Sequence, residues 1–350
     1  MNIIKIKEEL DKNRMTVSFD SYDIAIRQMI DMVIEESINI SPEYQRHFVW
    51  DEVRQSQLIE SIFLGIPVPN LFMATNEDAS WDVVDGVQRI TTILNFMCQE
   101  EQLTGILKKF KKLKLTGMEK LTQMNGLYFD DLPNNLKLMF STRSIRLTVL
   151  NDKSDFNVRY DLFERLNTGG VVLHPQQIRN CVFIGEFNDF INRLSQDLNF
   201  RKVVKTTENA ERNGSFEEIA LKFFAYLEYV EKFDHGVKDF LNEYMKFKTN
   251  SFKNKKELES NFKETFELLA RLIPSGIVRG NRKNITPIVL YEAISVGTCN
   301  AMKVDKNKIT TAKLSSLLND EKLKKLTTGG TNDKNKVFSR IKYVKDYLLA

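Results

Sequence analysis

Cysteine and histidine are scarce in this sequence, with three of each in 350 residues. The cysteines stand at positions 98, 181 and 299, so they form no Cys-x-x-Cys pair and no disulfide framework. The equally scattered histidines exclude the common zinc patterns. We therefore expect the cysteines to be small buried side chains in a protein of a reducing compartment, without thiol or zinc chemistry.

Long apolar runs are also lacking, because no stretch approaches the ~20 residues that a transmembrane helix needs. Residues 1–14 carry too many charges for a signal peptide. We expect a soluble, cytoplasmic protein with no membrane partner. The net charge is only +4, from 51 Lys and Arg against 47 Asp and Glu, which neither indicates nor excludes a nucleic-acid partner.

Proline is absent from residues 176–273, whereas five of the seven prolines lie at or before position 175. Proline marks turns and helix starts, so the first half should be mixed and the second nearly all helical. The length predicts two units at ~150 residues per domain. We predict an α+β fold class: a small mixed domain over residues 1–200, followed by a mostly α-helical domain over residues 201–350.

Hydrophobic spacing predicts the elements of each half. In the first half it predicts helices over 22–36, 52–64 (with Gly65 as C-cap) and 155–166, a further helix whose apolar stripe is Ile90, Ile93, Leu94 and Met97, and strands over 70–74, 81–84 and 145–149. In the second half it predicts helices over 186–198, 236–247, 258–273, 287–296, 310–326 and 335–349, and a capping box of Ser215 with Glu218 before a further helix.

The sharpest cluster runs from Trp81 to Thr92, where a predicted strand meets a glycine turn and then a helix. A helix start offers free backbone N–H groups and a positive dipole end, which suit an anion. Gly86 permits close approach of a ligand, and Gln88 and Arg89 supply an amide donor and a planar fork for phosphate oxygens. Asp85 could hold a divalent cation or a ligand hydroxyl.

A plainer interpretation of the same cluster is a strand–turn–helix in which Asp85 caps the helix and Arg89 is paired on the surface. Spacing alone favours this plainer interpretation. The sequence contains neither a Walker A loop nor the glycine pattern of a dinucleotide site.

A second cluster, residues 40–51, combines aromatic and polar groups before a helix, with Gln45 and Arg46 repeating the Gln-Arg pair. For Phe48 and Trp50, packing in the core is favoured over stacking on a base. Asp51 is a candidate N-cap for the helix 52–64.

The third cluster is a predicted helix ending in Glu164, Asn167 and Thr168, followed by two glycines and a helix that begins at Pro175. Its polar groups could contact phosphates or a metal, although the same pattern also describes a simple helix C-cap and turn. The basic run Lys108–Lys114 is interpreted as a solvated helix face rather than a nucleic-acid contact.

Taken together and in this order, the clusters resemble a known family. The patterns are Ile-x-Pro-x-Tyr-Gln-Arg-x-x-x-Trp, Asp-Gly-x-Gln-Arg-x-Thr-Thr and Phe-Glu-x-Leu-Asn-Thr-Gly-Gly, over residues 20–200. They are similar to the DGQQR-motif family, which includes the N-terminal domain of GmrSD-type modification-dependent restriction endonucleases. The resemblance implies a fold related to the ParB/sulfiredoxin superfamily.

The resemblance also implies a nucleoside-triphosphate (NTP) site without a P-loop, assisted by Mg²⁺, in a protein whose nucleotide cycle gates attack on foreign, often modified, DNA. By position it assigns catalytic roles to Asp85, Gln88 and Arg89; nucleotide contacts to Gln45, Arg46, Gly86, Thr91, Glu164, Asn167 and Thr168; and metal ligation to Asp85, Glu164 and Asn167.

Two departures from the family matter. Val87 replaces the first glutamine of the motif, which could slow or abolish hydrolysis. After position 175 only His235 remains, so an HNH-type nuclease site is not expected. The implied partner is a separate nuclease subunit, with DNA as a further candidate, and a homodimer is left open.

Three hypotheses therefore stand: an NTP-hydrolysing component of a phage-defence or restriction system, a non-catalytic nucleotide-dependent adaptor, and a DNA-binding regulatory module. The adaptor would bind its nuclease through the helical half, and Val87 favours it. The mild net charge gives the DNA-binding module little support.

Overall fold

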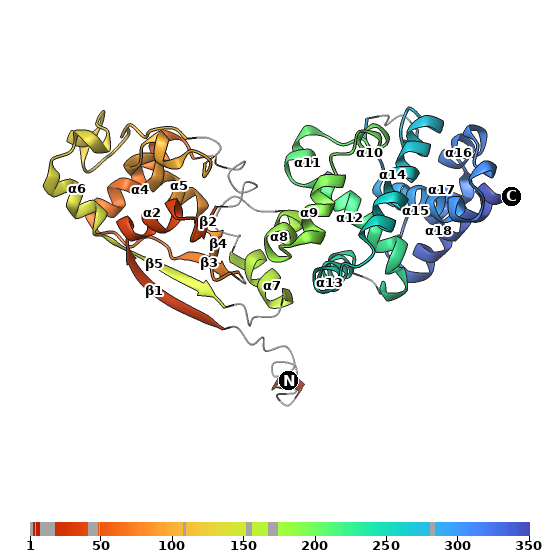
Figure 1. Cartoon of the computed structure of the whole chain (residues 1–350), viewed down its shortest axis with the longest axis horizontal. Helices are drawn as coiled ribbons and strands as arrows, with labels where there is room; N and C mark the ends of the chain where they lie inside the picture. Colours follow the sequence, from red (N-terminus) through yellow and green to blue (C-terminus); the bar gives the residue numbers. More distant parts are fainter. Residues whose placement is uncertain are drawn as a thin grey trace. The chain divides into compact units, whose positions relative to one another are not determined.

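The computed structural model divides into two compact units, Met1–Val172 and Leu173–Ala350 (Figure 1). It describes residues 3, 5–7, 18–40, 48, 50–76, 78–107, 110–151, 156–166, 174–234, 236–280 and 284–350. The units part earlier than the expected boundary near residue 200. The reason is that the helices just after residue 173 pack against helices further along the second unit.

The first unit is built on a mixed five-stranded sheet. Its strands are β1 (Phe19–Ala25), β2 (Ile38–Asn39), β3 (Leu71–Thr75), β4 (Trp81–Asp85) and β5 (Ser144–Leu150), in the spatial order β1-β5-β3-β4-β2. The pairs β1–β5 and β3–β4 are antiparallel, whereas β3–β5 and β2–β4 are parallel. This sheet and the helical second unit confirm the predicted α+β class.

Most helices of the first unit lie on one side of this sheet (Figure 1). They are α2 (Ile26–Ile34), α4 (Glu52–Leu64), α5 (Val87–Met97), α6 (Asn134–Ser141) and α7 (Phe156–Leu166), with short 3₁₀ turns η1 (Glu100–Leu103), η2 (Thr122–Met124) and η3 (Phe129–Asp131). The caps predicted for α4 are confirmed: Asp51 Oδ1 accepts from the Arg54 N–H at 2.8 Å, and Gly65 ends the helix at φ 72°.

The predicted helix over 22–36 was wrong in its first turn. Residues up to Ala25 form β1, whose Ile24 lies opposite Ile145 of β5, and α2 begins only at Ile26. Pairing with a distant strand outweighs local helical spacing here, and a single sequence does not show that pairing. The two-residue strand β2 was missed as well.

The basic run was also wrong as a helix face. Lys108 and Lys109 lie outside the described residues, and residues 110–118 form neither helix nor strand. Leu113 and Leu115 are buried, and the Leu113 N–H donates to the Asn95 carbonyl at 2.8 Å. Alternate side chains of this segment therefore anchor it to the first unit.

Glu60 of α4 buries its carboxylate against this irregular region, with 7% of the residue exposed. Burial alone would raise its pKa, but the backbone N–H groups of Leu121, Lys120 and Glu119 donate to the carboxylate and hold the pKa below its usual value. The distances to Glu60 Oε1 are 2.7 Å from both Lys120 and Leu121. The Glu60 side chain thus fixes the 119–121 loop, which belongs to no helix or sheet.

The second unit is a helical assembly, as the lack of proline predicted. Its helices are α8 (Pro175–Val182), α9 (Glu186–Leu194), α10 (Leu198–Val203), α11 (Glu208–Arg212), α12 (Ser215–Glu228), α13 (Val237–Asn250), α14 (Lys255–Leu272), α15 (Ile288–Asp305), α16 (Thr311–Leu318), α17 (Glu321–Leu326) and α18 (Lys334–Leu349), with 3₁₀ turns η5 (Val230–Lys232) and η6 (Lys306–Lys308). Phenylalanine rings fill its core. The centre of the Phe262 ring lies 4.5 Å from that of Phe266 and 5.3 Å from that of Phe224.

The predicted capping box was wrong. Gly214, at φ 77°, is the N-cap of α12, and no side chain caps the helix. The Glu218 carboxylate instead pairs with Arg179 Nη1 at 3.1 Å and Lys222 Nζ at 3.3 Å. Burial raises the pKa of Glu218, but the charges of Lys222 and Arg179 outweigh it and bring the pKa below its usual value. Glu218 therefore neutralises buried cations instead of completing the helix cap that the local pattern predicted.

An ion pair buried from solvent joins α15 to α18. Arg340 Nη2 lies 2.6 Å from Glu292 Oε2, and the two side chains are 1% and 4% exposed. Lys222 Nζ is 3.9 Å from the other Glu292 oxygen. Both charges therefore lie in the core of the second unit, where each is tolerated because the other neutralises it.

Cys98 and Cys299 are buried and Cys181 is half-buried, and all three are free thiols. Burial raises the pKa of Cys98 to about 11 and also raises that of Cys299, which keeps both in the unreactive thiol form. Within the described part of the chain, no helix is long and apolar enough to cross a membrane.

Candidate functional site

The first motif turn joins β4 to α5 at Gly86, which has φ 107° and serves as the N-cap residue of α5. A Cβ at this position would overlap Leu71 Cδ2 of the neighbouring strand β3. Both the dihedral and the close approach therefore require glycine. Asp85 does not cap the helix, contrary to the plainer interpretation, because the N-cap position is Gly86, which has no side chain to accept from the first-turn N–H groups.

Arg89, in the first turn of α5, is buried rather than paired on the surface, with 9% of the residue exposed. Its Nη2 donates to Asp85 Oδ2 at 2.6 Å. Its Nη1 donates to the carbonyls of Pro69 and Asn70, the latter at 3.1 Å. The guanidinium thus ties the end of β4 to the segment that leads into β3.

The second motif cluster meets this turn through Trp50. The Trp50 N–H donates to Gln88 Oε1 at 3.3 Å, and its carbonyl accepts from Gln55 Nε2 at 3.0 Å. The Arg54 guanidinium lies 4.9 Å from the centre of the Trp50 ring. Both backbone polar groups of Trp50 are therefore bonded by side chains of α4 and α5, at the end of the segment that carries Gln45 and Arg46.

A polar stripe follows Gln88 along α5. Thr91 and Asn95 are 3% and 2% exposed, and Asn95 Nδ2 donates weakly to Gln55 Oε1 at 3.4 Å. Thr91 Oγ1 and Asn95 Oδ1 have no hydrogen-bond partner among the described residues. Buried polar atoms are normally satisfied, so this stripe is unusual in an otherwise apolar helix interface.

Gln55 and Asn95 are the site residues that sequence reasoning missed. Gln88, Thr91 and Asn95 recur at i, i+3 and i+7, so they share one face of the helix. This polar stripe among apolar residues was the signal that could have found Asn95, whereas Gln55 lies on α4, outside the stripe.

The third cluster approaches through α7, which packs against β4, the strand that ends in Asp85. Tyr160 and Phe163 are the buried side chains of this packing face, at 0% and 3% exposure. Glu164, next to Phe163, is exposed. The structure therefore brings α7, with its predicted ligand Glu164, to the strand of the first motif.

The predicted site residues divide into two groups. Asp85, Gly86, Gln88, Arg89 and Thr91 lie on a single turn and helix start, and Glu164 lies on the helix packed against that strand. Gln45, Arg46, Asn167 and Thr168 lie outside the described residues, as does His47. Phe48 and Trp50, expected in the core, are half-buried.

Comparison with known families agrees with this arrangement. Residues 26–184 match the GmrSD restriction endonuclease N-terminal domain. This match confirms the resemblance inferred from the motifs and associates the domain with restriction systems. No curated protein and no solved structure matches the chain, so the relation to the ParB/sulfiredoxin fold stays a prediction.

The GmrSD N-terminal-like match ends at residue 184, just after α8 and beyond the contact boundary between the units. It thus includes all three motif clusters and the start of the helical unit. In this domain Val87, the departure from the family motif, is 6% exposed at the first position of α5. A glutamine at this position would have to bury its amide or turn it toward the ligand.

The donor set of the domain suits Mg²⁺ only as a shared ion. Asp85 and Glu164 supply carboxylates, the hard oxygen ligands that Mg²⁺ prefers. The described residues contain no group of three or more acidic, histidine or cysteine side chains able to hold a metal ion. Mg²⁺ usually takes one or two carboxylates together with substrate phosphates and waters. Asp85 and Glu164 could supply the carboxylates, and a bound triphosphate would supply the phosphate oxygens.

Proposed function

We propose that this protein is an NTP-binding and NTP-hydrolysing component of a phage-defence or restriction system. It would gate attack on foreign, possibly modified DNA through a separate nuclease. The family match supports the restriction context, and the nucleotide activity is our inference from the site.

One observation carries the proposal: the described parts of the second and third motif clusters contact Gln88 or β4, the strand that leads into the Gly86 turn. Gln88 of the first cluster binds the backbone of Trp50 in the second, and α7 of the third packs against β4. Segments more than 100 positions apart, Trp50 and α7, thus contact the helix start or its strand, and a helix start with a glycine N-cap offers backbone N–H groups and a dipole that favour phosphate.

Each residue has a defined part in this proposal. The first-turn N–H groups of α5 and the Gln88 amide would bind phosphate oxygens, and Arg89 would hold the turn and balance the developing charge. Asp85 and Glu164, with Asn167, would hold Mg²⁺ against the phosphates. Thr91 offers a buried hydroxyl without a partner among the described residues, which a ligand or water could satisfy.

The charge arrangement implies one rearrangement. Arg89 is engaged by Asp85 and two carbonyls, so Arg89 and Asp85 cannot both turn to new partners without breaking their 2.6 Å contact. A bound Mg²⁺–triphosphate would replace it, with the metal taking Asp85 and the phosphates taking the guanidinium.

A second candidate function is a nucleotide-dependent adaptor without turnover, favoured by Val87. An apolar side chain at this position cannot orient the attacking water as an amide can. The two functions differ in phosphate release and share nucleotide binding.

Phosphate release from each of the four NTPs, measured with the purified full chain and Mg²⁺, tests the proposal. We expect turnover that Arg89→Lys lowers by ten-fold or more, because lysine keeps the charge but loses the fork. Circular dichroism checks that the variant folds. Release from no NTP, with binding retained, would select the adaptor, and Val87→Gln should then raise hydrolysis.

A further inference from the structure

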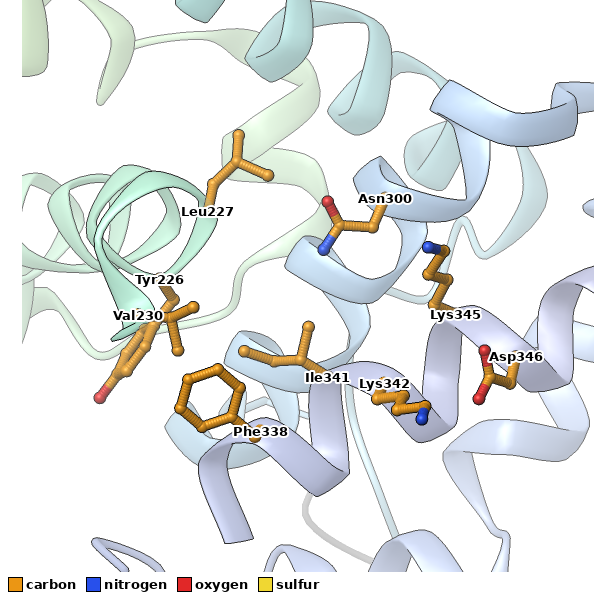
Figure 2. A pocket seen from close by; sticks show the side chains of 9 residues that line it. All are labelled: Tyr226, Leu227, Val230, Asn300, Phe338, Ile341, Lys342, Lys345 and Asp346. Carbon is orange, nitrogen blue, oxygen red and sulfur yellow. The ribbon is translucent and has the colours of Figure 1, made fainter. Parts of the chain in front are cut away.

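A pocket opens on the second unit between α12, α15 and α18, far in sequence from the motif clusters. Figure 2 shows the side chains from these elements facing one another around it. Its volume is about 270 Å³. The pocket is lined by Tyr226, Leu227, Val230, Asn300, Phe338, Ile341, Lys342, Lys345 and Asp346.

The floor of this pocket is apolar. Tyr226 and Ile341 are 1% and 7% exposed, and Leu227, Val230 and Phe338 are half-buried around them. The Tyr226 ring is held from behind by Phe240, with the ring centres 5.1 Å apart. The floor is therefore a rigid surface for an apolar group, and its volume lies just under the ~300–1,000 Å³ of small-molecule sites.

The rim is positively charged, and so is the whole end of the chain. Residues 301–350 contain twelve Lys and Arg against five Asp and Glu, a net +7, although the full chain carries only +4. At the rim, the exposed Lys342 and the half-buried Lys345 stand against one carboxylate, that of the exposed Asp346, so two positive charges meet one negative charge. Nearby, Lys308 and Lys336 donate to backbone carbonyls, which leaves their charge unneutralised.

We propose that this pocket is a docking site for an acidic segment of a partner protein, which inserts one bulky apolar side chain between α12 and α18. A single buried anchor in a pocket, surrounded by weaker polar contacts, is the common energetic pattern of protein interfaces. Carboxylates beside the anchor would meet Lys342 and Lys345 and speed the encounter. The inference does not depend on nucleotide hydrolysis.

The lining favours a protein anchor over a nucleobase. A base buried here would bring several polar edge atoms, whereas Asn300 is the single uncharged amide among the lining side chains. Polar atoms buried without partners cost roughly 1–3 kcal/mol each. An aliphatic or aromatic side chain loses nothing on the same surface and gains from its burial.

Fluorescence polarisation with the full chain, without nucleotide, tests this site. The probe is a labelled peptide in which one tryptophan is flanked by glutamates on both sides; the comparison peptides replace the tryptophan by alanine or the glutamates by lysines. We expect saturable binding of the first peptide and binding at least ten-fold weaker of the other two.

Two matched double variants locate the binding. Lys342→Glu with Lys345→Glu should weaken binding of the tryptophan peptide by ten-fold or more. Lys324→Glu with Lys325→Glu changes the charge equally on α17, outside the pocket, and should weaken it by less than about three-fold. Phe338→Ala removes a wall without a charge change and should also weaken it by several-fold.

Three results would overturn the proposal. One is no saturable binding of the tryptophan peptide, and another is equal loss in both double variants. The third is preferential binding of duplex DNA that is lost with the Lys342 and Lys345 changes, which would make the surface a nucleic-acid contact. Loss of phosphate release in these variants is not expected, so the nucleotide proposal stands or fails separately.

Discussion

Each unit of this protein contains a buried arginine–carboxylate pair at 2.6 Å, and the two pairs differ in their surroundings. The side chains of Arg89 and Asp85 are 11% and 33% exposed and lie beside a glycine turn. Those of Arg340 and Glu292 are 1% and 4% exposed and lie between two long helices. Solvent can therefore reach the first pair and cannot reach the second.

This difference separates a pair that serves a site from a pair that serves the fold. Breaking a fully buried pair strands a charge that water cannot reach, whereas a pair at the solvent edge is partly rescued by hydration. Both tryptophans, Trp50 and Trp81, lie in the first unit. Tryptophan fluorescence therefore follows that unit alone, while circular dichroism follows both.

Glu292→Gln should give the largest effect, because it leaves Arg340 buried without a counter-charge. We expect the second unit to lose about 3–5 kcal/mol of unfolding free energy. Urea unfolding would show this loss by circular dichroism, with little change in the fluorescence transition. Asp85→Asn, at the pair near the solvent edge, should cost less than half as much. Equal losses would remove the distinction between the two pairs.

Gly86→Ala should destabilise the first unit by about 2–4 kcal/mol, through its left-handed dihedral and the overlap with Leu71. Gly105→Ala is the matched control, since Gly105 has φ 86° but no atom within 4 Å of the added Cβ. The control should cost only about 1–2 kcal/mol. Fluorescence-detected unfolding measures both, and similar values would argue against close packing at the motif turn.

Glu60→Gln should change the acid stability of the first unit. The folded pKa of Glu60 lies below its ordinary 4.5, so its stabilisation is present above pH 4.5 and is lost as the pH falls through the folded pKa. At pH 7 we expect the variant to lose about 1–3 kcal/mol. Between pH 5 and 3 the gap from the wild type should narrow in fluorescence-detected unfolding. A constant gap would mean that the carboxylate charge does not hold the 119–121 loop.

Glu259→Gln should give the smallest effect, although Arg193 binds Glu259 through two hydrogen bonds of 2.9 Å. Hydrogen bonds from Arg193 and Lys263 lower the pKa of Glu259 to about 2. The Arg193 side chain is 48% exposed, however, and water and salt weaken such a pair. Thermal unfolding at pH 7 should shift by no more than that expected for about 1 kcal/mol, and a loss rivalling Glu292→Gln would contradict this order.

Local patterns predicted the elements whose determinants are local. Asp51 and Gly65 bound α4 as expected, and the strand–glycine–helix order around Gly86 was visible in the sequence. What failed depended on distant partners: residues 22–25 joined β5, and Glu218 left its expected cap for Arg179. Long-range pairing and buried charge leave no periodic trace in one sequence.

The candidate site was predicted residue by residue, but its internal contacts were not. The sequence indicated Asp85, Gln88 and Arg89 as ligand-binding groups, without showing that Arg89 is engaged by Asp85 and two carbonyls. It also did not indicate that Gln88 and Gln55 hydrogen-bond the backbone N–H and carbonyl of Trp50. Those contacts depend on how α4 and α5 pack, which motif spacing does not specify.

Calorimetric titration of the full chain with a triphosphate and Mg²⁺ tests the central claim most directly. The account predicts saturable binding that requires Mg²⁺ and that Asp85→Asn weakens by about ten-fold or more, while Glu292→Gln leaves it unchanged at a temperature where both variants are folded. Absence of binding for every NTP by the folded wild type, or equal binding by Asp85→Asn, would contradict a nucleotide site at the Gly86 turn.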